Sequence, residues 1–297
     1  MNRGFWYAVG AYVIWGVFPV YWKWLHQVPS GQLLSHRILW SFLLLLPIVL
    51  LRREWSAIRA AIRSPRILVV SVAAALLLGI NWLIYVWAVD AGFIVECSLG
   101  YFINPLLNVL LGVLFLHEHL RGWQWVAIGG AAVGVLFLTI SYGSLPWIAL
   151  TLAFSFAIYA LIKKTTPLGS IHGLTLETGI LFLPALFWLL QAEINGQGAF
   201  LHLGAIANLL LVGSGVATAV PLLMFAESAK RIPLSLVGIL QYIAPILQFL
   251  LGVFLYGEPF TQTSALGFGI VWAALILFGA ESLFHRRANN LPAVTTV

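Results

Sequence analysis

Charged residues are scarce in this 297-residue chain, and there is only one cysteine. Charged residues make up 8% of the chain and hydrophobic residues 62%, whereas soluble domains average about 25% charged and about 45–50% apolar residues. This balance excludes a soluble globular domain, and it also excludes disorder, which requires low hydrophobicity and high net charge. Cys97 has no second cysteine to pair with, so a disulfide scaffold is excluded as well. The remaining class is an integral membrane protein.

Long apolar stretches follow one another along the chain, and each can cross a bilayer as a helix of about 20 residues. Ten can be marked, at about 4–22, 33–51, 67–89, 93–116, 123–140, 145–162, 172–190, 206–227, 235–256 and 263–284. No segment between them is long enough for a soluble domain. The sequence therefore predicts an all-α integral membrane protein with ten transmembrane helices.

The basic residues are distributed unevenly between the two sides of this predicted arrangement. With the N-terminus inside, thirteen of the fifteen Lys and Arg residues fall in inside segments. The exceptions are Lys23, which falls outside, and Arg37, which lies within a span. Because basic loops stay on the cytoplasmic side, we expect both termini in the cytoplasm. This topology accounts for the net charge of +6, so the charge predicts no nucleic-acid partner.

The two halves of the chain resemble each other. Shifting the sequence by 140 residues aligns segment 98–120 with segment 238–260 without a gap, and eight of 23 positions are identical. The informative identities pair Pro105 with Pro245, Gly112 with Gly252 and Glu118 with Glu258. Five spans per repeat is an odd number, so the second half enters the membrane inverted relative to the first. The sequence predicts a first five-helix repeat at 1–142, a second, inverted repeat at 143–285 and a cytoplasmic tail at 286–297.

These residues resemble a known family of membrane proteins. A Pro in the fourth helix of each half, a Gly seven residues later and a Glu six residues beyond that look like the drug/metabolite transporter superfamily and its EamA-type members. The stretches YVIWGVFPVYWKWL, LLSHRILWS, NWLIYVWAVDAG, VECSLGYFINPLLNVLLG and LQYIAPILQFLLGVFLYGE resemble the RarD subgroup. Asp90 stands where that pattern has a neutral polar residue. The resemblance runs over residues 4–284 and implies a multi-pass transporter of small metabolites or drugs in the bacterial inner membrane.

The second predicted helix carries Arg37, a charge that is costly inside a bilayer and marks a functional site by default. Trp40 lies three residues further on, on the same helical face. Arg37 can bind an anionic or carboxylate-bearing substrate beside Trp40, or it can extend to the outer headgroups. A third possibility is an ion pair with Glu96, which begins the fourth helix at similar depth and would make both residues gates.

Polar residues recur at helical spacing on the third and fourth predicted helices. Asn81 and Tyr85 share a face of the third helix, and Tyr101 and Asn104 belong to a polar stripe on the fourth. Such a stripe must face protein or water rather than lipid. Interhelical hydrogen bonding explains it as well as a substrate cavity does. We favour the cavity for Tyr101 and Asn104, because Pro105 follows them and leaves a backbone carbonyl free one turn earlier.

The second half has matching polar residues on its fourth helix. Gln241 is the repeat partner of Tyr101, and Tyr242 follows it. We predict that the substrate lies between these two helices. Trp15, which lies deep in the first helix, is expected to line the same cavity, although core packing explains such a residue equally well.

Glu177 is the repeat partner of Arg37 and lies near the inner end of the seventh predicted helix. A carboxyl group held in low-dielectric surroundings can carry a proton, so Glu177 and Glu96 are the candidate proton-coupling or gate residues. The alternative for Glu177 is a salt bridge to nearby lysines such as Lys163.

The sequence predicts a secondary transporter, an exporter rather than an importer, which moves an amino-acid-like, aromatic or drug-like small molecule through a membrane of lipid. Alternating access around a cavity near the midplane is the expected mechanism. No cofactor or metal site is predicted, since His117-Glu118-His119 lacks the spacing of a metal-binding helix. The alternatives are an integral membrane enzyme acting on a lipid or quinone, and a passive facilitator or channel.

Overall fold

The computed structural model describes residues 3–91, 93–142, 145–256 and 262–289, and the described residues are helical apart from short connections. The helices are α1 Arg3–Lys23, α2 Ser30–Leu51, α3 Trp55–Arg63, α4 Pro65–Asp90, α5 Ile94–Leu116, α6 Gly122–Tyr142, α7 Trp147–Thr165, α8 Ser170–Ile194, α9 Ala205–Arg231, α10 Leu234–Gln241, α11 Ile243–Leu250, the π-helical turn η1 Leu251–Leu255, and α12 Gln262–Asn289.

Nine spans within the described residues are long and apolar enough to cross a membrane, counting α10, α11 and η1 as one. The described part of α12 adds a shorter apolar segment, Ala265–Glu281. This finding confirms a multi-pass, all-helical membrane protein. The tenth span and the sidedness of the termini stay predictions.

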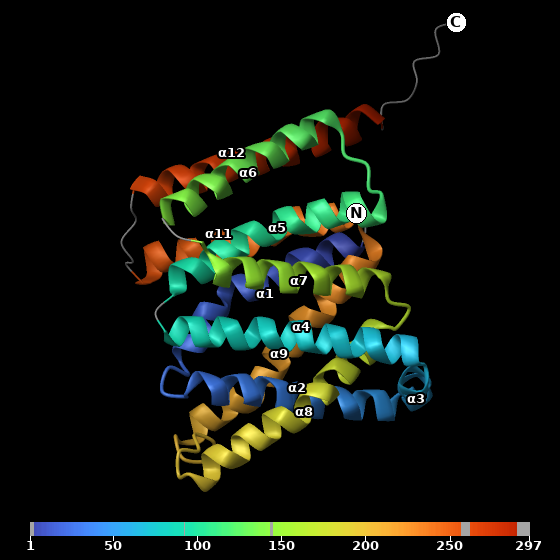
Figure 1. The fold of residues 1–297 in the computed structure, drawn as a ribbon, viewed down its shortest axis with the longest axis vertical. Helices are drawn as coiled ribbons and strands as arrows, with labels where there is room; N and C mark the ends of the chain where they lie inside the picture. The colour runs from blue at the N-terminus through green and yellow to red at the C-terminus, as the bar shows by residue number, and fades with distance from the viewer. Residues whose placement is uncertain (1–2, 92, 143–144, 257–261, 290–297) are drawn as a thin grey trace, which may run out of the picture.

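The spans lie side by side, and their lengths run across the view in Figure 1. The helix α1 begins and α12 ends at the same end of the bundle. Arg3, the Arg52–Arg53 pair, Arg121, the Lys163–Lys164 pair and the Lys230–Arg231 pair lie at helix ends that face the same way. We call this end the basic end and the other the far end.

The short helix α3 is an element that the sequence did not predict. It lies across the bundle at its basic end (Figure 1) and packs against α4 and α8. Ile58 and Ala61 are buried, whereas Arg59 and Arg63 are exposed. A short helix with one apolar and one basic face is typical of the membrane interface.

The two halves of the chain have matching helix contacts. For most pairs of helices that pack together, their counterparts about 140 residues away in the sequence also pack together. The helix α1 packs on α9 and α11, and α7, its counterpart, packs on α4 and α5. Counterparts also pack on each other: α2 on α8, α5 on α10, and α6 on α12. The α6–α12 pair forms a separate layer at one end of the molecule's long axis, beyond α5 and α11 (Figure 1).

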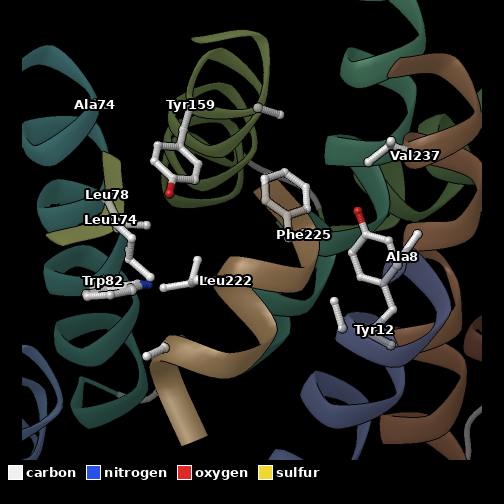
Figure 2. Packing of buried hydrophobic residues seen from close by; sticks show 14 of the residues in the cluster. Ala8, Tyr12, Ala74, Leu78, Trp82, Tyr159, Leu174, Leu222, Phe225 and Val237 are labelled. Atoms are coloured by element: carbon white, nitrogen blue, oxygen red, sulfur yellow. The ribbon is translucent and has the colours of Figure 1, made fainter. Parts of the chain in front are cut away.

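The main core lies among α1, α2, α4, α7, α8, α9 and α10. Figure 2 shows it as a band of side chains that runs from Trp82 on α4, past Tyr159 and Phe225, to Tyr12 on α1. Tyr12, Tyr159 and Phe225 are each fully buried. Large rings at this depth join helices of both halves, and so they position the residues around the site.

Candidate functional site

One cavity of about 250 Å³ opens between the two halves of the chain. Residues from α1, α2, α4, α5, α7, α9, α10 and α11 line it. They are Tyr12, Trp15, Phe18, Pro19, Trp22, Arg37, Asn81, Trp82, Tyr85, Gly100, Tyr101, Asn104, Leu152, Phe156, Thr218, Leu222, Gln241, Ala244, Pro245 and Gln248.

The cavity lies in the half of the bundle away from the basic end. On α7, which begins at the far end, Leu152 and Phe156 line the cavity, whereas Lys163 lies two turns beyond them. On α9 the lining residues Thr218 and Leu222 likewise precede the basic end. The floor of the cavity is therefore the side that faces the basic end.

Arg37 is held between two indole rings at the far end of the cavity. Its guanidinium carbon lies 4.9 Å from the ring centroid of Trp22 and 4.9 Å from that of Trp82. Its Nε–H donates to the hydroxyl oxygen of Thr218 on α9 at 3.0 Å. Both indole contacts are at cation–π distance, so the side chain is fixed by α1, α4 and α9 at once.

The predicted ion pair between Arg37 and Glu96 involves a side chain outside the described residues. Glu96 belongs to α5, but the described part of the structure does not include its carboxyl group. None of the ion pairs between described residues includes Arg37. The pair therefore stays a prediction.

The wall beside Arg37 is made by Asn81, Tyr85 and Tyr101. The Asn81 amide donates to the Leu152 carbonyl at 2.8 Å and to the Ser155 hydroxyl at 2.9 Å, which ties α4 to α7. The rings of Tyr85 and Tyr101 meet edge to face with their centroids 5.9 Å apart. One face of α4 and one face of α5 thus supply polar groups at one depth.

A chain of amides joins α5 to α10 and α7. Asn108 donates to the side-chain oxygens of Asn104 at 3.2 Å and of Gln241 at 2.8 Å, and Asn104 donates to the Ala153 carbonyl at 2.6 Å. Buried amides need such partners. The chain holds the Asn104 and Gln241 side chains at the cavity wall, on the two helices that are repeat counterparts.

The floor of the cavity is a cluster of aromatic rings. Phe225 packs against Trp15 at 5.8 Å, Phe156 at 5.2 Å and Tyr12 at 6.4 Å, measured between ring centroids. Tyr159 stacks on the other side of Phe225, with an interplanar angle of 13°. This aromatic floor separates the cavity from the basic end.

A buried ion pair lies directly behind the aromatic floor. Lys163 Nζ lies 2.8 Å from Glu177 Oε1, and the Tyr159 hydroxyl donates to Glu177 Oε2 at 3.0 Å. The Lys163 and Glu177 side chains are only 1% and 4% exposed. Glu177 is thus not among the residues that line the cavity. It forms the salt bridge to Lys163 that the sequence offered as the alternative to a proton-coupling role.

The structure brings together most of the predicted substrate residues. The residues that line the cavity are Trp15, Arg37, Asn81, Tyr85, Tyr101, Asn104 and Gln241.

Two predicted residues, Trp40 and Tyr242, do not line this cavity. The Trp40 ring packs against that of Phe200, with the ring centroids 5.7 Å apart. Tyr242 follows Gln241 by one residue, a rotation of about 100° on a helix. Its ring is therefore directed into a cluster with Phe102, where its hydroxyl donates to the Phe102 carbonyl at 3.2 Å.

Several lining residues were not identified from the sequence. The position of Trp22 near a span end is typical of an interfacial tryptophan, and Thr218 has no distinctive neighbours in the sequence. Thr218 and Leu222 are four residues apart and so share a face of α9. This spacing is hard to recognise in the sequence, because most residues of the helix are apolar. Gln248 also lines the cavity. Its spacing of seven residues from Gln241 places the two glutamines on one helical face, which is a clearer sequence signal than that of Trp22 or Thr218.

Comparison with known proteins gives relatives along almost the whole chain. The EamA-like transporter family matches residues 2–140. The chain is 46% identical to the uncharacterized transporter YojE of Bacillus subtilis, over 97% of both proteins. It is 45% identical to protein RarD of Streptomyces exfoliatus, over 97% of this chain and 92% of that protein. Protein RarD of Escherichia coli K12 is 40% identical, over 97% of this chain and 98% of that protein.

A solved crystal structure has the same fold. It superposes with a TM-score of 0.70 at 18% identity and covers 94% of this chain and 98% of that chain. At this identity the likeness shows the fold alone. The whole-length relatives decide the family: the chain belongs to the RarD subgroup of the EamA-like transporters, within the drug/metabolite transporter superfamily, and is a multi-pass membrane transporter.

Proposed function

We propose that this chain is a secondary transporter that carries a small organic molecule by alternating access between two inverted halves, residues 1–142 and 143–285. The observation that carries the proposal is the cavity itself. Both halves contribute walls to it, and an aromatic floor closes it toward the basic end. A site between inverted repeats near the midplane is the usual arrangement in secondary transporters. Transport, rather than an enzymatic reaction, is the activity that we assign to it.

The internal symmetry supports the mechanism. Because α1 packs on α9 and α11 much as α7 packs on α4 and α5, the two halves can exchange conformations while the helix partners stay the same. The exchange would open the floor toward the basic end and close the far end. The same cavity would then face each side of the membrane in turn.

We assign the basic end to the cytoplasm of a bacterial cell, with ten spans in the inner membrane and both termini inside, because basic loops stay cytoplasmic. The described structure would then face outward. We further propose export as the working direction.

The Lys163–Glu177–Tyr159 cluster is our proposed lock of the inner side. Opening the floor separates α7 from α8, the helices that carry the ion pair. Protonation of Glu177 would remove its attraction for Lys163 and release the lock, which would couple transport to protons. Glu96, at the other end of the bundle, is the second proposed coupling residue.

The test is uptake and efflux of labelled amino acids, aromatic compounds and drugs by proteoliposomes, with and without a pH gradient. We expect at least one compound to be concentrated against its gradient, and Arg37→Ala and Gln241→Ala to reduce that transport at least tenfold. Gln191→Ala, a change at an exposed position of α8, is the matched control for Gln241→Ala and should leave transport unchanged.

Three results would redirect the proposal. If no compound in the panel moves, the transporter mechanism loses its support. If compounds move only down their gradients, the protein is a facilitator. If Glu177→Gln and Glu96→Gln keep the pH dependence of the wild type, these carboxyl groups do not couple transport to protons.

A further inference from the structure

Among the described residues that line the cavity, Arg37 is the single charged one. The other lining residues are aromatic, aliphatic, amide or hydroxyl residues and glycine or proline, with no Asp, Glu, Lys or His among them. A guanidinium group stays protonated in proteins. The cavity wall therefore carries one positive charge, and no described carboxylate lies within 4 Å to neutralise it.

The guanidinium group keeps donors free for a ligand. Its Nε–H is taken by Thr218, and the faces of the group are covered by Trp22 and Trp82. Among the described residues, none accepts a hydrogen bond from the two terminal nitrogens. These nitrogens form the planar pair of donors that matches a carboxylate in a bidentate contact. The contacts thus fix the orientation of the group and leave its anion-binding edge available.

The remainder of the cavity suits a flat apolar body. Trp15, Phe18 and Phe156 line it together with Leu152 and Leu222. Its volume of about 250 Å³ is below the roughly 300–1,000 Å³ of sites for drug-sized ligands. A single aromatic ring with a short side chain fits this size better than a large drug does.

We propose that the cargo of this cavity is a small aromatic organic anion, and that Arg37 selects it by its charge. The proposal rests on the transporter function proposed above and names its substrate class. With a neutral cargo, no described carboxylate would balance the charge of the guanidinium in surroundings of low dielectric, which is costly. A cationic cargo would add like-charge repulsion. The ammonium group of a zwitterion would find no carboxylate among the lining residues.

The test compares four ligands of similar shape and different charge. They are 3-phenylpropionate, 3-phenylpropionamide, phenylalanine and 2-phenylethylamine, and binding to the purified full-length protein is measured by calorimetry. We expect 3-phenylpropionate to bind at least about tenfold more tightly than the amide, since a hydrogen bond to a charged group is worth that factor or more. 2-Phenylethylamine should bind most weakly.

Variants at Arg37 show whether the preference for the acid depends on the charge of this residue or only on a folded cavity. Arg37→Gln should reduce the preference for the acid over the amide to less than about twofold, whereas Arg37→Lys should keep part of it. Arg52→Gln changes an exposed arginine at the end of the same helix and should leave the preference unchanged. If Arg37→Gln fails to fold, Thr218→Val serves instead. It removes the Nε partner and should weaken binding of the acid but not of the amide.

The proposal is overturned if the amide, the zwitterion or the amine binds as tightly as the acid, or if none of the four ligands binds. Uptake by proteoliposomes distinguishes this failure from failure of the transporter function. If a neutral or zwitterionic compound is transported and Gln241→Ala stops it, the transporter stands and the anion selectivity falls. If the acid binds through Arg37 but crosses no bilayer, the selectivity stands and the transporter falls.

Discussion

At the scale of single residues, the structure explains Gly112 and Glu118, two of the residues that recur in the second half of the sequence. Glu118 follows the end of α5 and turns back to the start of α10. Its carboxylate accepts hydrogen bonds from the backbone N–H of Leu234 at 2.5 Å and of Ser235 at 2.9 Å, and from the Ser235 hydroxyl at 2.7 Å. The first N–H groups of a helix have no partner within the helix, and a carboxylate there also suits the helix dipole. Glu118 is thus a cap for a helix of the other half.

Gly112 makes room for this cap. A Cβ atom on Gly112 would lie 2.7 Å from Glu118 Oε2 and 3.2 Å from Ser235 N. The counterpart Glu258 lies outside the described residues.

We predict that Gly112→Ala destabilises the protein by about 1–2 kcal/mol, the usual cost of losing an N-terminal cap. Glu118→Ala should have a similar effect, and the double variant should cost little more than either change alone, because both remove one interaction. Thermal unfolding in detergent measures all three. Gly129→Ala is the control, since no atom lies within 4 Å of its Cβ position. Equal stability of Gly112→Ala and Gly129→Ala would contradict the cap.

At the scale of elements, hydropathy and proline predict most of the structure. The predicted spans agree with the observed helices to within a few residues at most ends, because burial in lipid requires continuous apolar helices. The break between α10 and α11 was not predicted, although Pro245, four residues after Gln241, contributes to it. Proline has no N–H for the Gln241 carbonyl and clashes with that turn. The helix restarts at Ile243, whereas α5 runs unbroken through the counterpart Pro105.

The rotation of each helix about its axis was harder to predict. Hydropathy is high all around these helices, so it gives little information about which face meets which neighbour. Trp40 and Tyr242 show the consequence. Each is close in sequence to a residue that lines the cavity, but Trp40 packs against Phe200 and Tyr242 against Phe102. Spacing identified the correct helices but not the complete set of lining residues.

The crossing of α2 and α9 depends on Gly215. A Cβ atom there would lie 2.5 Å from the Trp40 carbonyl carbon and 2.8 Å from Ser41 N. Ser41 donates to the Gly215 carbonyl at 3.1 Å. Close contact of helix backbones at a small residue is a main source of stability in membrane bundles.

We predict that Gly215→Val forces α2 away from α9 and moves Arg37 relative to Thr218. The variant should lose at least about 2 kcal/mol of stability, as overpacking commonly does, and should lose affinity for any ligand of the cavity. Thermal unfolding and calorimetry test the two effects. Gly279→Val, in α12 where nothing lies within 4 Å of the Cβ position, should leave both unchanged. A folded Gly215→Val protein with wild-type affinity would show that this crossing does not position the site.

At the scale of the whole molecule, the sequence predicts properties that depend on total composition better than it predicts which side chains contact each other. Membrane residence follows from the total of apolar residues, and the repeat follows from one alignment. The lock behind the floor depends on which side chains meet. Lys163 and Glu177 lie on successive helices, and their pairing was one of two interpretations because several lysines lie nearby in the sequence. Tyr159, the third member, could not be assigned from the sequence, because its contact with Glu177 depends on how the side chains of α7 and α8 meet.

The lock makes a prediction about the stability of the whole protein. Changing one member of a buried ion pair leaves an unpaired charge and costs about 3–5 kcal/mol, whereas replacing both members with neutral side chains is often neutral or stabilising. Lys163→Met and Glu177→Gln should therefore each lower the unfolding temperature. The double variant should recover most of the loss, since the amide introduced by Glu177→Gln can still accept a hydrogen bond from Tyr159.

The recovered double variant would have a weaker inner lock, so the floor should open more often. In a Cys97→Ser background, Phe225→Cys should then react faster with a membrane-impermeant thiol reagent applied from the basic end. Neutralising the ion pair between Arg121, which precedes α6, and Glu281 on α12 should change neither stability nor labelling by a comparable amount, because that pair lies away from the floor. If labelling at position 225 is unchanged in the double variant, the Lys163–Glu177 pair stabilises the bundle without controlling access to the cavity.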